Sequence, residues 1–270
     1  MDFIYSALAG VIQGLTEFLP VSSSGHLVLV HDIFKFNFPD NIFYDVTMHV
    51  ATLVALVFFF RKDVARLLGG FGRSLGRRDL VNDPEQRLAW LLILATVPAG
   101  AAGYLLETVI GNLHRQPFVV AAALAAVAGL FFAAERHAAQ KKIVADMSAA
   151  DAAAIGFAQA LAFIPGISRS GITLVAGLGL GLKRQEAARF SFLLSIPTIF
   201  GAAVKKGLEV KDWPSAGIPV LAVGFAAALV SGILAIRFFM RFAGRHPLNV
   251  FAWYRIALSA LIVLWLLATR

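Results

Sequence analysis

The amino-acid sequence predicts an all-α integral membrane protein with six transmembrane helices and two re-entrant broken-helix hairpins in an inverted-topology repeat. Three observations predict this class: the composition, six long apolar segments, and two apolar regions broken by proline, serine and glycine. Of the 270 residues, 59% are hydrophobic and 15% are charged, against about 25% charged in an ordinary soluble domain. One soluble core of this size cannot bury so much apolar surface, so much of it is expected to face lipid.

Six apolar segments are long enough to cross a bilayer as helices, which takes about 20 predominantly apolar residues. They lie near residues 42–60, 88–106, 117–134, 186–204, 216–236 and 250–268. Two further apolar regions, 3–32 and 152–182, are interrupted at Pro20–Gly25 and at Pro165–Gly171. Each is expected to form two half-helices joined by a polar turn. Such turns are tolerated at membrane depth only where their backbone groups are buried in protein or line a water-filled cavity.

The two interrupted regions are similar to each other without any gap. At a constant offset of 146, the residues Gly10, Gln13, Leu15, Ser22, Ser24 and Gly25 match Gly156, Gln159, Leu161, Ser168, Ser170 and Gly171. Three spanning segments separate the two copies, so the second copy is expected to enter the membrane from the opposite face. We assign residues 1–270 to a single membrane domain, with repeat one at about 1–134 and repeat two at about 150–270. Paired breaks in inverted repeats indicate a central site.

The distribution of basic residues predicts the orientation, because cytoplasmic loops are enriched in Lys and Arg. Loops 61–87, 135–151, 183–189 and 237–249 share one side and hold 16 basic residues, whereas the other side holds six. The first side is expected to be cytoplasmic and both termini to lie outside. The net charge of +8 resides in clusters between apolar segments, a pattern that argues against nucleic-acid binding. The chain has no Cys, which excludes disulfides and cysteine-ligated metals.

The first interruption contains a carboxylate, serines and a histidine. Gln13 and Glu17 are four residues apart and therefore share a helix face, and His26 follows the serine run. An ionisable group at the membrane centre costs about 2.5–3.5 kcal/mol and is usually functional, so we favour function over a Glu17 that snorkels to an interface. Hydroxyls and free N–H groups at the start of a half-helix bind anions. The alternative is that the serines only cap that half-helix.

The second interruption places an arginine deep in an apolar region. A guanidinium such as Arg169, far from either flanking loop, suits a multidentate anion such as phosphate. The alternative is an internal ion pair between Arg169 and Glu17 that holds the repeats together. The candidate substrate-binding residues are Gln13, Ser22, Ser24, Gly166, Ser168, Ser170 and Thr173.

Together the two turns offer the groups that phosphoryl transfer requires: a carboxylate, an imidazole, a guanidinium, hydroxyls and two positive helix ends. The candidate catalytic residues are Glu17, Ser23, His26 and Arg169. Glu17, with Gln13, is expected to hold a divalent cation, Mg²⁺ or Ca²⁺, that also binds substrate phosphates. Ser23 or His26 would attack phosphorus, or His26 would activate water.

Three residues outside the turns are expected to have structural roles only. Arg255 lies near one end of the last apolar segment and is expected to snorkel to the cytoplasmic surface. Gly177 and Gly181 are spaced as a small-residue pair and are expected to form a helix-packing face.

Two strings resemble the signatures of the undecaprenyl-diphosphate phosphatase family, also called the bacitracin-resistance family. They are QGLTEFLPVSSSGH at Gln13–His26 and PGISRSGIT at Pro165–Thr173. The resemblance covers the whole chain, including FSFLLSIP at Phe190–Pro197 and the Tyr254–Arg255 pair. It implies a multi-pass hydrolase of the bacterial inner membrane that removes one phosphate from undecaprenyl diphosphate and so recycles the lipid carrier for cell-wall synthesis.

The resemblance also implies roles for single residues. Gln13 and Glu17 fill the (Glu or Gln)-x-x-x-Glu positions, Ser23 and His26 the serine and histidine positions, and Arg169 the position of the phosphate-binding arginine. Because Gln13 is the glutamine form, a metal site with two carboxylates is put in doubt. The family further implies a site that faces outward, dependence on a divalent metal, and a homodimer.

The alternative function is a secondary transporter or flippase of a lipid-linked or anionic phosphate, because inverted repeats with broken helices are typical of alternating access. A transporter needs a site that is reachable from both faces, and it needs no nucleophile. A purely structural subunit would leave Glu17, His26 and Arg169 unexplained.

Overall fold

The computed structural model describes residues 2–28, 42–77, 79–80, 82–105, 116–209 and 217–269. Its helices are α1 (Asp2–Phe18), α2 (Ser23–Val28), α3 (Ile42–Phe59), α4 (Arg61–Gly76), α5 (Pro84–Leu105), α7 (Pro117–His137), α8 (Ala149–Ala160), α9 (Arg169–Gly179), α10 (Arg184–Glu209), α11 (Gly217–Ala243) and α12 (Asn249–Ala268), with the 3₁₀ turns η2 (Val144–Asp146) and η3 (Leu161–Phe163). In these ranges the β-structure is limited to one bridge, between Lys142 and Leu182. The all-α prediction is confirmed.

Five of the described helices are long and apolar enough to cross a membrane, namely α5, α7, α10, α11 and α12. A sixth span results if α3 and α4, which bend by 84° at their junction, count as one. The five helices overlap five of the predicted segments, and α3 alone covers the sixth, 42–60. The chain is a multi-pass membrane protein. The inverted topology of the repeats stays a prediction.

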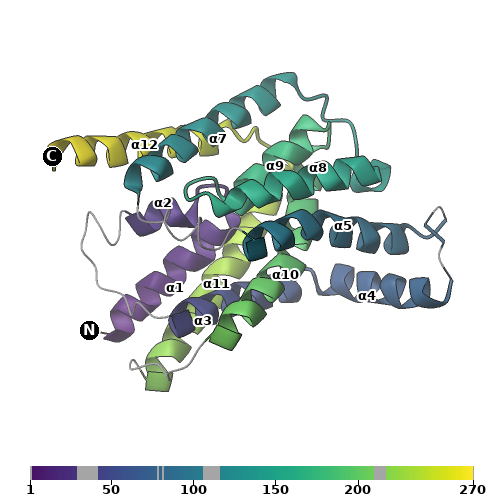
Figure 1. Cartoon of the computed structure of the whole chain (residues 1–270), viewed down its shortest axis with the longest axis horizontal. Helices are drawn as coiled ribbons and strands as arrows, with labels where there is room; N and C mark the ends of the chain where they lie inside the picture. The colour runs from purple at the N-terminus through teal and green to yellow at the C-terminus, as the bar shows by residue number, and fades with distance from the viewer. Residues whose placement is uncertain are drawn as a thin grey trace.

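The expectation of a loop over residues 61–87 is wrong for its first half, which forms α4. Apolar residues at Val64, Leu67, Leu68 and Phe71 recur at helical spacing, but the charged residues between them conceal the pattern. α4 lies along α5 (Figure 1). At Gly70 the two helices are so close that an added Cβ would lie 2.8 Å from the backbone of α5.

The two predicted helix breaks are present, between α1 and α2 and between α8 and α9. Ser22 and Ser168, which are equivalent in the repeat, have φ angles of +74° and +70°, in a region that non-glycine residues seldom adopt. The hydroxyl of each accepts a hydrogen bond from the N–H of the glycine three residues later, Gly25 at 3.3 Å and Gly171 at 3.2 Å. The sequence repeat therefore extends to backbone conformation and helix capping.

The first helix of each predicted repeat packs on a helix of the other repeat. Gly10 of α1 is in contact with α11, and its counterpart Gly156 of α8 is in contact with α5. A Cβ on Gly10 would collide with the carbonyl oxygen of Gly224, and one on Gly156 would lie 2.6 Å from that of Ala95. Glycine is therefore required at both crossings for the helices to approach this closely.

Replacing Gly10 with alanine is expected to lower the free energy of unfolding by about 1–3 kcal/mol, because the added methyl group must separate α1 from α11. The temperature of thermal unfolding in detergent measures this effect. Gly129→Ala on α7 is the matched control, since a Cβ there meets no atom within 4 Å. Equal unfolding temperatures for the two variants would contradict the close crossing.

The four segments that were predicted to share the cytoplasmic side lie together. Asp63 accepts a 2.6 Å hydrogen bond from Arg189, and Glu135 accepts one of 2.9 Å from Arg184 and one of 2.8 Å from the N–H of Leu248. The start of α1 and the end of α12 lie on the other side of the molecule (Figure 1). The grouping of these segments agrees with the prediction, whereas their cytoplasmic placement stays a prediction.

The expectation of a packing face that includes both Gly177 and Gly181 is wrong for Gly181. Gly177 lies within α9, where an added Cβ would be 3.1 Å from Ala187. Gly181 lies beyond the helix end with a φ of +91°. The hydrogen bonds from Gly181 N–H to Leu178 O and from Leu182 N–H to Gly177 O form a Schellman motif, so this glycine ends the helix.

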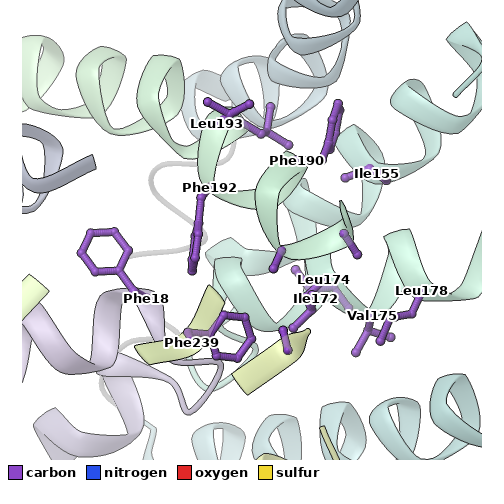
Figure 2. Close-up of a cluster of buried hydrophobic side chains, with 14 of the residues drawn as sticks. Phe18, Ile155, Ile172, Leu174, Val175, Leu178, Phe190, Phe192, Leu193 and Phe239 are labelled. Carbon is purple, nitrogen blue, oxygen red and sulfur yellow. The ribbon is translucent and has the colours of Figure 1, made fainter. Parts of the chain in front are cut away.

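A cluster of buried aromatic rings lies next to the helix breaks. Figure 2 shows Phe18, Phe192 and Phe239, which come from α1, α10 and α11. The Phe192 ring is 5.8 Å from that of Phe18 and 5.7 Å from that of Phe239, and both pairs are edge-on. Such pairs stabilise a core beyond the area they bury. Because Phe18 follows Glu17 directly, this cluster fixes the end of α1 that carries the carboxylate.

Candidate active site at the two helix breaks

The centre of the site is an ion pair that joins the two breaks. Nη2 of Arg169 lies 2.7 Å from Oε1 of Glu17. Glu17 lies in the last turn of α1, and Arg169 is the first residue of α9. The two side chains are only 14% and 10% exposed, Arg169 and Glu17 respectively. The ion pair that the sequence offered as the alternative role of Arg169 is therefore present, and it brings together two candidate catalytic residues that are 152 positions apart in the sequence.

Gln13 completes the surroundings of the carboxylate. Its Nε2 donates a 3.0 Å hydrogen bond to Oε2 of Glu17, so each carboxylate oxygen has a protein donor. In the described part of the chain, no three His, Asp or Glu side chains gather as a metal site would require. One carboxylate and one amide fit a Mg²⁺ or Ca²⁺ ion that keeps waters and takes phosphate oxygens as its other ligands. They do not fit an all-protein metal cage.

A ring of hydrogen bonds with residues of α9 and α10 holds Arg169 in place. Nη1 of Arg169 donates to the carbonyl of Ser195 at 3.2 Å, and the Ser195 hydroxyl donates to the carbonyl of Ser191 at 2.8 Å. The Ser191 hydroxyl is 2.6 Å from that of Thr173, which donates to the carbonyl of Arg169 at 2.8 Å. Thr173 therefore lies buried behind the arginine. Sequence reasoning noted the Phe190–Pro197 run but assigned its serines no role in the site.

The remaining serines line the two turns. The Ser168 hydroxyl is 3.2 Å from that of Ser170, which donates to the carbonyl of Leu19 in the first turn at 3.4 Å. Ser22 is fully buried by its cap to α2, and Ser23 is half-buried at the start of that helix. The side chain of Ser24 lies outside the described residues.

His26 is held by Ser22 and Tyr254. Its Nδ1 lies 2.7 Å from the carbonyl oxygen of Ser22, and its Nε2 lies 2.7 Å from the hydroxyl oxygen of Tyr254. Among the described residues, no hydrogen bond joins His26 to Glu17 or Arg169. The structure therefore places Tyr254, which sequence reasoning noted only as part of a family pattern, beside a candidate catalytic residue.

The expectation that Arg255 snorkels to the surface is wrong, because its side chain is fully buried. Nη1 donates to the carbonyl of Pro20 at 3.2 Å, and Nη2 donates to those of Gly166 at 2.7 Å and Ile167 at 3.0 Å. Its Nε donates to Leu124 at 3.4 Å. Pro20 and Gly166 are equivalent in the repeat, so one guanidinium holds the same carbonyl of both turns.

The physical reason is that a helix break leaves carbonyls without a helical N–H donor. Burying such a carbonyl without a partner is costly, and a guanidinium has five donors in a fixed geometry. Gly166, a predicted substrate-binding residue, supplies one of these carbonyls and has a φ of +97°. An added Cβ there would collide with the carbonyl oxygen of Val120. An arginine inside the last apolar segment was the available sequence signal for this role.

The chain is similar to known proteins over nearly its whole length. The family described as "Bacitracin resistance protein BacA" matches residues 6–261, a range that includes both helix breaks and most of α12. A relative from Rubrobacter xylanophilus named "Undecaprenyl-diphosphatase" is 46% identical over 276 residues, which cover 99% of each chain. Relatives of the same name from Myxococcus xanthus and Desulforudis audaxviator are 41% and 42% identical. They cover 98% and 94% of this chain, and 90% and 94% of their own length.

Proposed function

Because the chain belongs to the bacitracin resistance protein (BacA) family, we propose that it hydrolyses undecaprenyl diphosphate to undecaprenyl phosphate and inorganic phosphate. The single observation that supports this best is the meeting of Glu17 and Arg169 at two capped helix breaks in an integral membrane protein. Water adds to the terminal phosphorus, and the anhydride bond to the lipid phosphate breaks. The product is the lipid carrier that cell-wall synthesis reuses, as the resemblance implies.

Arg169 binds the terminal phosphate in this proposal. It begins α9, so the free N–H groups and the positive end of that helix also face the incoming anion. The hydroxyls of Ser168 and Ser170 lie in the same turn. When the substrate binds, a phosphate oxygen replaces the Glu17 carboxylate on Nη2 of the guanidinium. A bidentate contact from Arg to phosphate is strong and directional.

Glu17 and Gln13 would hold the divalent cation once Arg169 has turned to the phosphate. The ion would polarise the phosphate oxygens as a Lewis acid and neutralise the charge that develops on them. Gln13 must present its Oε1, because its Nε2 faces Glu17 in this structure. Water or Ser23 attacks phosphorus, and His26 accepts the proton at Nε2, since Nδ1 faces a carbonyl oxygen that can only accept.

Removal of divalent metal is expected to lower the initial rate of phosphate release by about tenfold or more, because one carboxylate alone cannot balance the charge of the diphosphate. The measurement is release of inorganic phosphate from undecaprenyl diphosphate by the detergent-purified chain, with and without EDTA, followed by readdition of Mg²⁺ or Ca²⁺. Release that is unaffected by EDTA would contradict the metal role. Absence of release under every metal and pH value would contradict the hydrolase itself.

A transporter or flippase is not favoured, because the full-length relatives are named as phosphatases. We place the enzyme in the bacterial inner membrane with both termini outside and the site opening on that face. The support is the grouping of the basic segments on one side of the molecule. We also propose a homodimer, for which the family resemblance is the support.

A further inference from the structure

The imidazole of His26 has a defined tautomer in this structure. Nδ1 lies 2.7 Å from the carbonyl oxygen of Ser22, which can only accept a hydrogen bond, so Nδ1 carries the proton. In the neutral ring the lone pair is then on Nε2, 2.7 Å from the hydroxyl of Tyr254. That hydroxyl meets a lone pair only by donating its O–H. Both nitrogens of the ring are therefore held by protein groups.

The position of Tyr254 is itself tightly determined. The next residue in the chain is Arg255, whose guanidinium is fixed to the carbonyl of Pro20 in the same turn that contains Ser22. On the other side, the ring of Trp253 lies edge-on to Phe132 of α7 at 5.1 Å. The rings of Tyr254 and His26 are nearly parallel, at 9°, with centroids 5.7 Å apart. Both hydrogen-bond partners of the imidazole are thus tied to the first helix break.

Tyr254 is the more exposed of the two partners of the imidazole. The tyrosine is 45% exposed, whereas Ser22, the other partner of the imidazole, is fully buried. An incoming group can therefore approach Nε2 from the tyrosine side but cannot approach Nδ1. Nε2, the nitrogen that faces the Tyr254 hydroxyl, is the one on which acid–base chemistry at this histidine depends.

We infer that Tyr254 is a positioning residue for His26: with the carbonyl of Ser22, which fixes the Nδ1–H tautomer, its hydroxyl holds the imidazole ring in one orientation. When substrate binds, the attacking hydroxyl or water replaces the tyrosine hydroxyl at Nε2. The proton of the attacking O–H passes to Nε2, its oxygen forms the new bond to phosphorus, and the bond from phosphorus to the lipid phosphate breaks. This role rests on the proposed function, but the tautomer does not.

The kinetic test compares Tyr254→Phe, His26→Ala and the double variant in phosphate release. Tyr254→Phe removes one hydrogen bond and is expected to lower kcat by about tenfold with KM unchanged. His26→Ala is expected to lower kcat by about 10²-fold or more. If Tyr254 acts only through His26, the double variant is no slower than His26→Ala. Tyr104→Phe is the matched control, because it removes a hydroxyl from an exposed tyrosine of α5.

The second test uses ¹⁵N NMR of protein labelled at histidine, with the His26→Ala variant to assign the signal. Wild type and Tyr254→Phe are both expected to show one protonated and one bare nitrogen, because the carbonyl of Ser22 still accepts from Nδ1. The Nε2 signal is expected to move in Tyr254→Phe, because that nitrogen loses its hydrogen bond. The inference is overturned by full activity in Tyr254→Phe, by losses that multiply in the double variant, or by an Nε2 signal that does not move in Tyr254→Phe. An inactive wild type with the expected tautomer would count against the proposed function alone.

Discussion

Replacing Arg169 with alanine is expected to lower kcat/KM for undecaprenyl diphosphate by about 10²–10³-fold, the usual loss when a preorganised donor to a developing charge is removed. Nη1 of the guanidinium is held by the carbonyl of Ser195, so the side chain stays positioned when phosphate replaces Glu17 on Nη2. Arg169→Lys keeps the positive charge but lacks the planar guanidinium that binds phosphate through two hydrogen bonds. We therefore expect its kcat/KM to lie between those of wild type and Arg169→Ala. Steady-state phosphate release measures both variants.

The matched control for this loss is Arg241→Ala, which removes an exposed arginine from the last turn of α11. Its kinetics should equal those of wild type, because general charge attraction is not the source of the effect. Wild-type kcat/KM in Arg169→Ala would remove this residue from the site. A loss of similar size in Arg241→Ala would assign the effect to net charge.

Replacing Arg255 with methionine is the second change with a large expected effect. It should lower the free energy of unfolding by about 3 kcal/mol or more. The change removes the guanidinium that donates hydrogen bonds to the carbonyls of Pro20, Gly166 and Ile167, and the loss of a donor to a buried acceptor costs about 1–3 kcal/mol. Activity should fall with stability, because both turns lose their shared support. The unfolding temperature in detergent and phosphate release are measured on the same preparation.

Arg237→Met is the control for Arg255→Met, since it removes an exposed arginine from α11 and no buried contact. It should unfold at the wild-type temperature. An Arg255→Met protein that is as stable and as active as wild type would show that the turns hold their shape without the guanidinium.

The repeat explains why much of the site could be predicted from the sequence. Matching residues at one offset located both breaks, and two breaks in one bundle are expected to meet, so Glu17 and Arg169 were candidates for one site. The serine caps follow from the same pattern, because Ser22 and Ser168 hold the same position before Gly25 and Gly171. The local chemistry of these residues is encoded in short strings.

The roles of Arg255, Tyr254 and Ser195 could not be predicted, because they depend on which backbone and side-chain groups the fold brings together. Arg255 near a helix end has the sequence pattern of a snorkelling residue, and only the three-dimensional arrangement shows that carbonyls of both turns converge on it. Tyr254 and Ser195 act through their neighbours in space, on α2 and α9. Their role depends on packing between helices, which a single sequence does not specify. The sequence analysis did not predict helix α4, because charged residues lie between the apolar residues of that segment.

The most direct test of the central claim, that the two helix breaks form one active site, is phosphate release from undecaprenyl diphosphate by Glu17→Gln, Arg169→Ala and the double variant. Residues that act as a unit are not additive. We expect about 10²-fold or greater loss in each single variant, and a double variant no slower than the slower single one. Losses that multiply would show two independent contributions, and wild-type rates in both single variants would place the active site elsewhere.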